Sequence, residues 1–95
     1  MNEKSGDYFE LPIDGILDLH TFSPKEVKTL IPDYIDACLE KNILNIRIIH
    51  GKGTGVLRTI VHSILKKHPS VQSFRLDPEP GSSWGATLVQ LKKND

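Results

Sequence analysis

A glycine-rich turn flanked by basic side chains is the part of this sequence best suited to chemistry. A short run rich in β-branched residues, 46–49, leads into Gly51, Gly53 and Gly55, and a helical pattern begins directly behind them. A glycine turn between a strand and a helix start aims backbone N–H groups and the positive helix end at one point, which favours an anion. The pattern predicts a phosphate site whose members are Gly51, Lys52, Gly53, Thr54, Gly55 and Arg58, with His50 beside them.

Two further titratable side chains end an earlier strand pattern. Period-2 alternation over 15–20 puts Asp18 and His20 on the face opposite two leucines. The carboxyl ends of parallel strands in a β-α-β unit meet at one edge, so we expect His20 and His50 to meet beside the glycine turn. An acid, two imidazoles and a bed of amides suit phosphodiester cleavage, in which a His or Asp handles protons or a divalent metal.

The elements that must position these residues follow from apolar periodicity. A polar segment over 1–11 is expected to be a flexible arm, and 12–93 to form one domain. Within it the patterns predict helices from 24 to 40 and from 54 or 55 to 67, and strands over 15–20, 45–49, 71–77 and 86–92. Pro32 is expected to kink or locally break the first helix. The order β-α-β-α-β-β predicts a two-layer α/β sandwich, with both helices on one face of a four-stranded mixed sheet.

Charge is concentrated around the glycine turn. The formal net charge of the 95 residues is zero, which argues against a protein that coats nucleic acid through bulk charge. Residues 41–76, however, contain basic residues and no acid. The predicted partner is therefore DNA or RNA held at a compact positive site. Arg47, on the open face of the predicted sheet, is added to the candidate nucleic-acid-binding residues.

The same composition bounds the compartment and the cofactors. A single cysteine, Cys38, fits a reducing cytoplasm, and no apolar run approaches a membrane span or a secretion signal. The glycines read GxGxG rather than GxGxxG, so no nucleotide or organic cofactor is expected. His62 and His68 are predicted to have no special role, since with Cys38 they lack a zinc spacing. No obligate protein partner is evident.

Three motifs together resemble the Smr (small MutS-related) domain family. They are Leu17-Asp18-Leu19-His20, the run from His50 to Gly55, and Gly85-Ala86-Thr87, within a correspondence that covers about 13–91. The resemblance is to a stand-alone small protein of this family, and it implies a fold like the C-terminal domain of a bacterial translation initiation factor. It also implies nucleic-acid binding and, in several members, DNA-nicking or RNA-cleaving activity. It ties Asp18 and His20 to cleavage, and His50, Gly51 and Gly53 to substrate binding.

Two departures from the family pattern leave an alternative open. Thr21 stands where the family usually has glycine, and Ser82-Ser83-Trp84 stands where the family has a glycine-rich run. Trp84 is predicted either to stack on a base or to cover the end of the core. The sequence thus predicts a nucleic-acid-binding endonuclease; the alternative is a non-catalytic Smr module that binds structured or single-stranded nucleic acid.

The candidate catalytic residues are Asp18, His20 and His50, and two routes are open to them. In one, Asp18 binds Mg²⁺ or Mn²⁺, or orients His20, and His20 acts as general base. In the other, an RNA 2′-hydroxyl attacks while the two histidines serve as base and acid, and no metal is needed.

Overall fold

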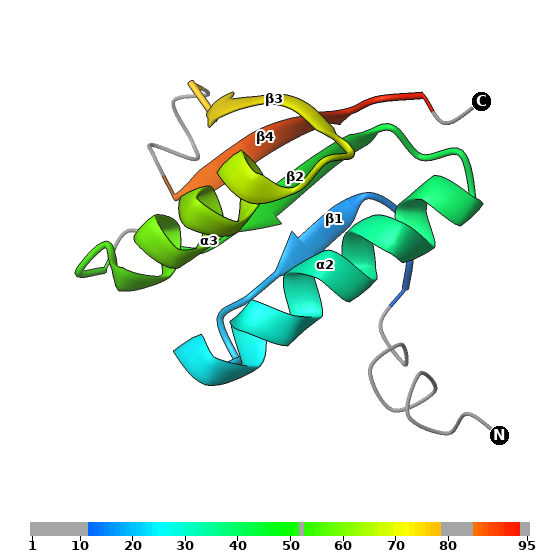
Figure 1. The fold of residues 1–95 in the computed structure, drawn as a ribbon. Helices are drawn as coiled ribbons and strands as arrows, with labels where there is room; N and C mark the ends of the chain where they lie inside the picture. Colours follow the sequence, from blue (N-terminus) through cyan, green and yellow to red (C-terminus); the bar gives the residue numbers. More distant parts are fainter. Residues whose placement is uncertain (1–11, 52, 79–84, 94–95) are drawn as a thin grey trace, which may run out of the picture.

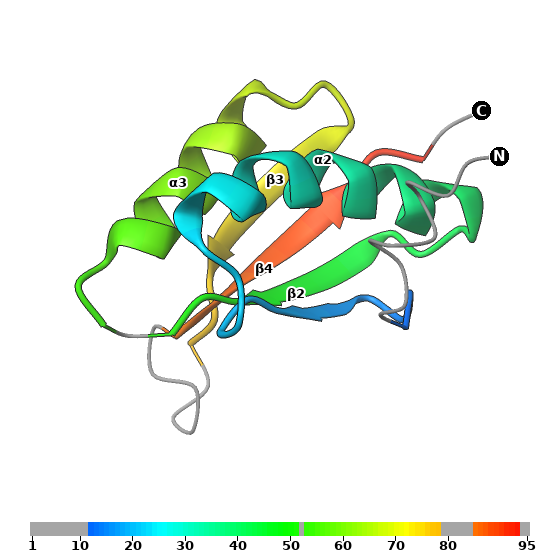
Figure 2. The same cartoon turned by 90° about the horizontal axis from the view of Figure 1, so that it is seen from below.

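Two helices cover one face of a four-stranded sheet, as Figures 1 and 2 show from two sides. The computed structural model describes residues 12–51, 53–78 and 85–93. The elements in chain order are β1 (Ile16–Asp18), α2 (Pro24–Glu40), β2 (Asn45–Ile49), α3 (Val56–Lys67), β3 (Val71–Leu76) and β4 (Ala86–Leu91). The predicted sandwich is confirmed. The arm predicted over 1–11 lies outside the described residues.

The sheet has the strand order β1-β2-β4-β3. β1 and β2 are parallel, and β4 runs antiparallel to both β2 and β3. The parallel pair continues past β1, because the Leu19 N–H donates to the Ile49 carbonyl at 2.9 Å. The carboxyl ends of β1 and β2 therefore lie together, and the starts of both helices lie at the same end of the molecule (Figure 1).

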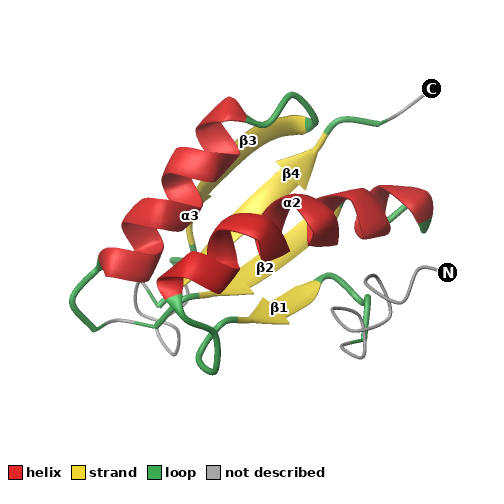
Figure 3. Ribbon diagram, turned by 60° about the horizontal axis from the view of Figure 1, so that its bottom comes forward, coloured by secondary structure: helices red, strands yellow, loops and turns green. Residues whose placement is uncertain are grey.

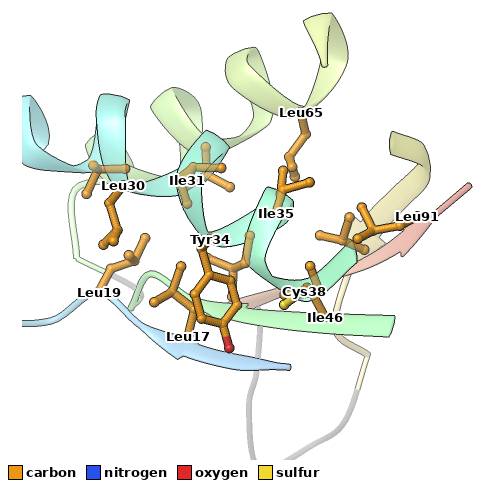
Figure 4. Close-up of a cluster of buried hydrophobic side chains, with 14 residues drawn as sticks. Leu17, Leu19, Leu30, Ile31, Tyr34, Ile35, Cys38, Ile46, Leu65 and Leu91 are labelled. Atoms are coloured by element: carbon orange, nitrogen blue, oxygen red, sulfur yellow. The ribbon is translucent and has the colours of Figure 1, made fainter. Parts of the chain in front are cut away.

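The core fills the space between the two layers (Figures 3 and 4). Apolar residues at helical spacing on α2 pack against alternate residues of the strands. The side chains drawn there are nearly all fully buried, and they include Leu17, Leu19, Leu30, Ile31, Tyr34, Ile35, Cys38, Ile46, Leu65 and Leu91. Since Leu17 of β1 and Leu19 just after it belong to this layer, the side chains between and after them point away from the helices.

A tyrosine of α2 fixes the start of β1. The Tyr34 hydroxyl accepts a hydrogen bond from the Gly15 N–H at 3.0 Å and donates to the Ile16 carbonyl at 3.4 Å. Gly15 has φ +92°, and a Cβ there would stand 2.9 Å from the Asn45 carbonyl oxygen. Only glycine combines that backbone with so close an approach to β2. β1 is thereby held against both α2 and β2.

Helix α2 begins where the sequence predicts and continues where a break was expected. Ser23 and Glu26 form a complete capping box, in which each side chain accepts the other residue's backbone N–H. The helix runs through Pro32 to Glu40, which confirms the single helix predicted over 24–40; of the two effects expected of Pro32, the local break does not occur. Pro32 removes one backbone hydrogen bond, but buried residues on both sides of it anchor the helix in the core. Within the described residues, neither helix is long and apolar enough to cross a membrane.

Candidate active site

The first part of the candidate site is an exposed acid–imidazole pair at the end of β1. His20 Nδ1 lies 2.9 Å from Asp18 Oδ1, and the His20 backbone N–H donates to the same oxygen at 3.0 Å. This backbone bond turns the chain and ends β1 at Asp18, two residues earlier than predicted. The side chains are 48% exposed for Asp18 and 75% for His20.

The Asp18 carboxylate is held in its charged form. The hydrogen bond from the His20 backbone N–H is the main cause that lowers the pKa of Asp18; burial opposes it, and the hydrogen bond and charge of the His20 ring add to the lowering. An ionised carboxylate accepts from an Nδ1–H, which leaves Nε2 of a neutral ring with the lone pair. The pair can therefore present a basic nitrogen to solvent.

The second part of the site is the loop between β2 and α3. Gly51 and Gly55 both have positive φ, +81° and +87°, and Gly55 precedes the first residue of α3. The loop lines a hollow of about 230 Å³ together with Pro24 of α2 and His50. The segment that follows the Asp18–His20 pair thus meets the glycine loop, as the parallel β1–β2 arrangement predicts.

Arg58 lies over this loop. Its Nη2 atom is 3.1 Å from the point where a Cβ at Gly55 would stand, and its side chain also lines the hollow. The first N–H groups of α3 have no acceptor within the helix. The guanidinium and these amides give the hollow a positive potential, which is the electrostatic condition for binding a phosphate.

His50 takes a different position from the one predicted. It follows Ile46 and Ile48 in the alternation of β2, so it lies on the helix side of the sheet and is only 7% exposed. The expectation that two imidazoles face one anion needs correction: His20 and His50 share one end of the sheet, but only His20 is exposed. Period-2 alternation is the reason, because it places His20 on the face of the sheet away from the helices and His50 on the helix side.

A threonine hydroxyl links the imidazole of His50 to the imidazole of His62 on α3. Nε2 of His50 and Nε2 of His62 lie 2.8 and 2.7 Å from the hydroxyl oxygen of Thr87, which is fully buried on β4. Nδ1 of His50 lies 3.2 Å from the Gly51 carbonyl. A carbonyl only accepts, so Nδ1 carries the proton and Nε2 accepts from Thr87. The Thr87 oxygen in turn accepts from His62, and the chain of bonds runs from His62 to Gly51 in one direction.

Both rings of this chain are held neutral. Burial is the main cause that lowers the pKa of His50, with a smaller lowering by the Arg58 charge and an opposing effect of the Gly51 carbonyl. Burial also leads in lowering the pKa of His62, followed by charge repulsion from His50, Arg58 and Lys66. His62 was predicted to have no special role, and no role was predicted for Thr87. The one signal available for His62 was its position one helical turn after Arg58.

Two other predicted binding groups are engaged within the protein. The N–H groups of His50 and Gly51 both donate to the Gly85 carbonyl at 2.9 Å, so the Gly51 amide is not among the donors that face the hollow. Arg47 Nε donates to Asp77 Oδ2 at 2.9 Å, and the Asp77 side chain is 3% exposed. Arg47 therefore lies on the open face, as predicted, and there it neutralises a buried carboxylate.

The remaining candidates divide into exposed and undescribed positions. Gly53, Thr54 and Thr21 are exposed. Lys52 and Trp84 lie outside the described residues, so their predicted roles stay predictions. Among the described side chains, no group of three or more His, Cys, Asp or Glu residues is arranged to hold a metal ion.

Comparison with known proteins decides the family. The Smr domain family model matches residues 17–92, which include all three motifs. The chain belongs to the Smr family. Endonuclease MutS2 of Staphylococcus carnosus is 41% identical to it over 76 residues, and endonuclease MutS2 of Clostridium novyi is 40% identical over 76 residues. Each alignment covers 80% of this chain and 10% of the relative, so the chain spans about a tenth of the length of these curated relatives.

Solved structures agree with this assignment. The Smr domain of Thermus thermophilus MutS2 superposes with a TM-score of 0.76 at 29% identity, covering 83% of this chain and 99% of that one. YdaL, a stand-alone small MutS-related protein from Escherichia coli, shares the fold with a TM-score of 0.77 at 24% identity, covering 98% and 78% of the two chains. This Smr domain is thus related to the Smr domains of MutS2 endonucleases in sequence and in fold.

Proposed function

We propose that this Smr domain is an endonuclease that cleaves phosphodiester bonds in DNA or RNA. The observation that carries the proposal is the exposed Asp18–His20 pair, with a 2.9 Å bond between the two side chains, at the end of the sheet that carries the glycine loop. The relationship to MutS2 proteins whose name includes endonuclease supports it. The proposal rests on the arrangement of the site. The Asp18–His20 pair and the glycine loop each supply one part of the chemistry.

His20 supplies the general base. With Asp18 holding Nδ1–H, Nε2 takes a proton from the attacking oxygen of a water or an RNA 2′-hydroxyl as that oxygen bonds to phosphorus. The bond from phosphorus to the leaving oxygen breaks, and the imidazolium or solvent water gives that oxygen a proton. Asp18 stabilises the imidazolium that forms, because its carboxylate is already ionised and 2.9 Å away. Catalysis by a positioned base of this kind contributes about 10²–10⁴-fold.

The glycine loop supplies the phosphate site. The N–H groups at the start of α3 and the Arg58 guanidinium stabilise the charge that grows on the phosphoryl oxygens. His50 acts in this scheme as a positioning residue: its bonds to the Gly51 carbonyl and to Thr87 fix the entry to the loop. Its burial separates it from the base function that we assign to His20.

A divalent metal fits this site only in part. One Asp18 oxygen is used twice by His20, so the carboxylate offers its other oxygen, and among the described residues no group of three or more His, Cys, Asp or Glu side chains completes a metal site. Mg²⁺ accepts such sites when substrate phosphates and water complete its shell. Asp18 would then be the protein ligand, and the ion would supply charge neutralisation at the phosphate.

One observation favours the alternative of a non-catalytic binding module. The second histidine of the predicted pair is buried, with both ring nitrogens in internal hydrogen bonds. Only one imidazole of the two therefore faces solvent to serve as acid or base. A module of this kind would keep the phosphate site of the loop and lose the cleavage step.

Cleavage assays on labelled single-stranded, duplex and branched DNA and RNA, with Mg²⁺, with Mn²⁺ and with a chelator, separate the two functions. We expect wild type to cut at least one substrate, and Asp18→Asn to bind it equally but to lose cutting by at least about 10²-fold. Asp14→Asn is the matched control, because Asp14 makes the same kind of bond, from the Ile16 N–H to its carboxylate, at the other end of β1.

The outcomes are distinct. If wild type binds and cuts nothing under any condition, the binding module is correct and the endonuclease is refuted. If Asp18→Asn cuts as fast as Asp14→Asn, the activity belongs to other residues or to a contaminant.

A further inference from the structure

The outward face of α3 carries a row of phosphate-binding side chains. Two neighbouring residues on each of three successive turns line a shallow hollow of about 700 Å³, and we call this set the α3 stripe: Arg58, Thr59, His62, Ser63, Lys66 and Lys67. Every member is a cation, an imidazole or a hydroxyl, and α3 contains no acidic residue. Side chains of these types are the ones that contact nucleic-acid phosphates.

The α3 stripe is continuous with the candidate active site. Arg58 lines the hollow of the glycine loop as well as the α3 hollow. From Thr59 the helix carries the next hydroxyl and cationic donors, Ser63 and Lys67, at intervals of about 6 Å. That interval is comparable to the separation of successive phosphates on one strand, so a strand anchored at the loop meets a new donor at each step.

Helix stabilisation does not account for the whole row. Lysines in a last turn are favourable because they face the negative end of the helix dipole. Arg58, however, lies in the first turn, where the dipole is positive and a cation is unfavourable. Its guanidinium also adds to the repulsion that lowers the pKa of the two nearby histidines. Both the helix dipole and the nearby histidines disfavour a positive side chain at this position. Its presence there indicates an anionic partner.

The position of the apolar residues of α3 indicates which kind of anionic partner fits the α3 stripe. Val61 and Leu65 are buried in the core, and the α3 stripe itself contains no Phe, Tyr, Trp, Val, Leu, Ile or Met. A helix that lies on a membrane needs an apolar face to insert between the lipids. The occupant that matches a row of donors without an apolar component is a phosphodiester backbone.

We propose that the α3 stripe is a track for the backbone of the nucleic-acid strand whose scissile phosphate sits at the glycine loop. This inference rests on the proposed function, since it assigns the path of the same substrate beyond the reacting phosphate. The track binds through phosphates and therefore holds strands of any sequence. It makes affinity depend on strand length, because a trinucleotide with one phosphate at the loop stops short of Lys66 and Lys67, whereas a strand four times as long also covers them.

The test compares two double variants that remove the same charge. Lys66→Gln with Lys67→Gln empties the far end of the α3 stripe, and Lys28→Gln with Lys41→Gln removes two exposed lysines of α2 and its end. Fluorescence anisotropy with labelled oligonucleotides of both lengths is measured over a series of salt concentrations. For the long strand, we expect the stripe variant to lose affinity on the order of tenfold at low salt, and its log–log salt slope to fall by about 1.4.

The trinucleotide should bind wild type and both variants alike, and the control variant should match wild type on the long strand. Equal losses in the two double variants would overturn the track, as would an equal loss on the trinucleotide. If wild type binds no oligonucleotide at all, the proposed function fails together with the track. If it instead binds vesicles of anionic phospholipid through Lys66 and Lys67, the stripe is a membrane surface and the proposal is wrong.

Discussion

Replacing Thr87 by valine tests whether one hydroxyl holds the two inner histidines together. The substitution keeps the shape of the side chain and removes the group that bonds to His50 and His62 at 2.8 and 2.7 Å. His50 is 7% exposed, so water cannot replace the lost donor, and the unsatisfied nitrogen costs about 1–3 kcal/mol. His62 is half-buried and regains part of its bond from water, which adds at most about 1 kcal/mol.

The free energy of unfolding should therefore fall by about 1–4 kcal/mol in Thr87→Val. Urea unfolding at neutral pH, followed by circular dichroism, measures this change, and the thermal midpoint should drop on the order of 10–20 °C. Thr59→Val, at an exposed position of α3, should stay within about 0.5 kcal/mol of wild type. Thr87→Ser keeps the hydroxyl and should lose only about 1 kcal/mol for the missing methyl group.

Two results would refute the reasoning. One is a Thr87→Val protein as stable as the Thr59→Val control. The other is a Thr87→Ser protein as unstable as Thr87→Val, since the methyl group and not the hydroxyl would then be responsible.

Three further predictions concern the same end of the sheet. Burial lowers the pKa of His62, so below the unfolded histidine value of about 6.5 the unfolded chain binds more protons and stability falls with acid until the folded pKa is passed. His62→Gln should flatten that dependence in urea unfolding across a pH series. Arg47→Gln leaves a buried carboxylate without its guanidinium and should cost about 2–3 kcal/mol in the same assay; a loss under about 0.5 kcal/mol would show the ion pair to be unimportant. Gly55→Ala forces a side chain into a left-handed backbone against a guanidinium 3.1 Å away, and should cost about 1 kcal/mol and weaken oligonucleotide binding. Gly53→Ala, which meets nothing within 4 Å, should leave stability unchanged, and equal effects of the two substitutions would contradict this account.

The sequence predicted the features that depend on local pattern. The capping residues Ser23 and Glu26 mark the start of α2, and alternation identified Asp18 as exposed beside buried leucines. Both rules relate residues that are only a few positions apart, so they can be applied to a single sequence. The joining of β1 to β2 at their carboxyl ends followed from the β-α-β order, which leaves little choice of topology.

The features that the sequence did not predict depend on register and packing between distant segments. Thr87 meets His50 because β4 pairs with β2 in one register, in which Ile48 is opposite Thr87. His62 joins them only because α3 packs over that end of the sheet. Arg47 and Asp77 are thirty residues apart and form their ion pair across β4. No local pattern encodes which of several registers is adopted.

The alternation of β2 would also have predicted the buried position of His50. Counting from Ile46 and Ile48 puts His50 on the core side, whereas the prediction used only its position at the end of the strand. Sharing an edge brings residues close along the sheet, and it does not put their side chains on the same face. The distinction separates a positioning histidine from one that reaches substrate.

The central claim is that the exposed His20 ring removes a proton during phosphodiester cleavage. The most direct test is the single-turnover cleavage rate of His20→Ala with and without added imidazole. Since the His20 side chain is 75% exposed, its removal leaves a space open to solvent that free imidazole can enter. We predict unchanged substrate binding, a rate reduced by about 10²–10⁴-fold, and partial recovery as imidazole is added. Cleavage by His20→Ala at the wild-type rate, without imidazole, would contradict the account.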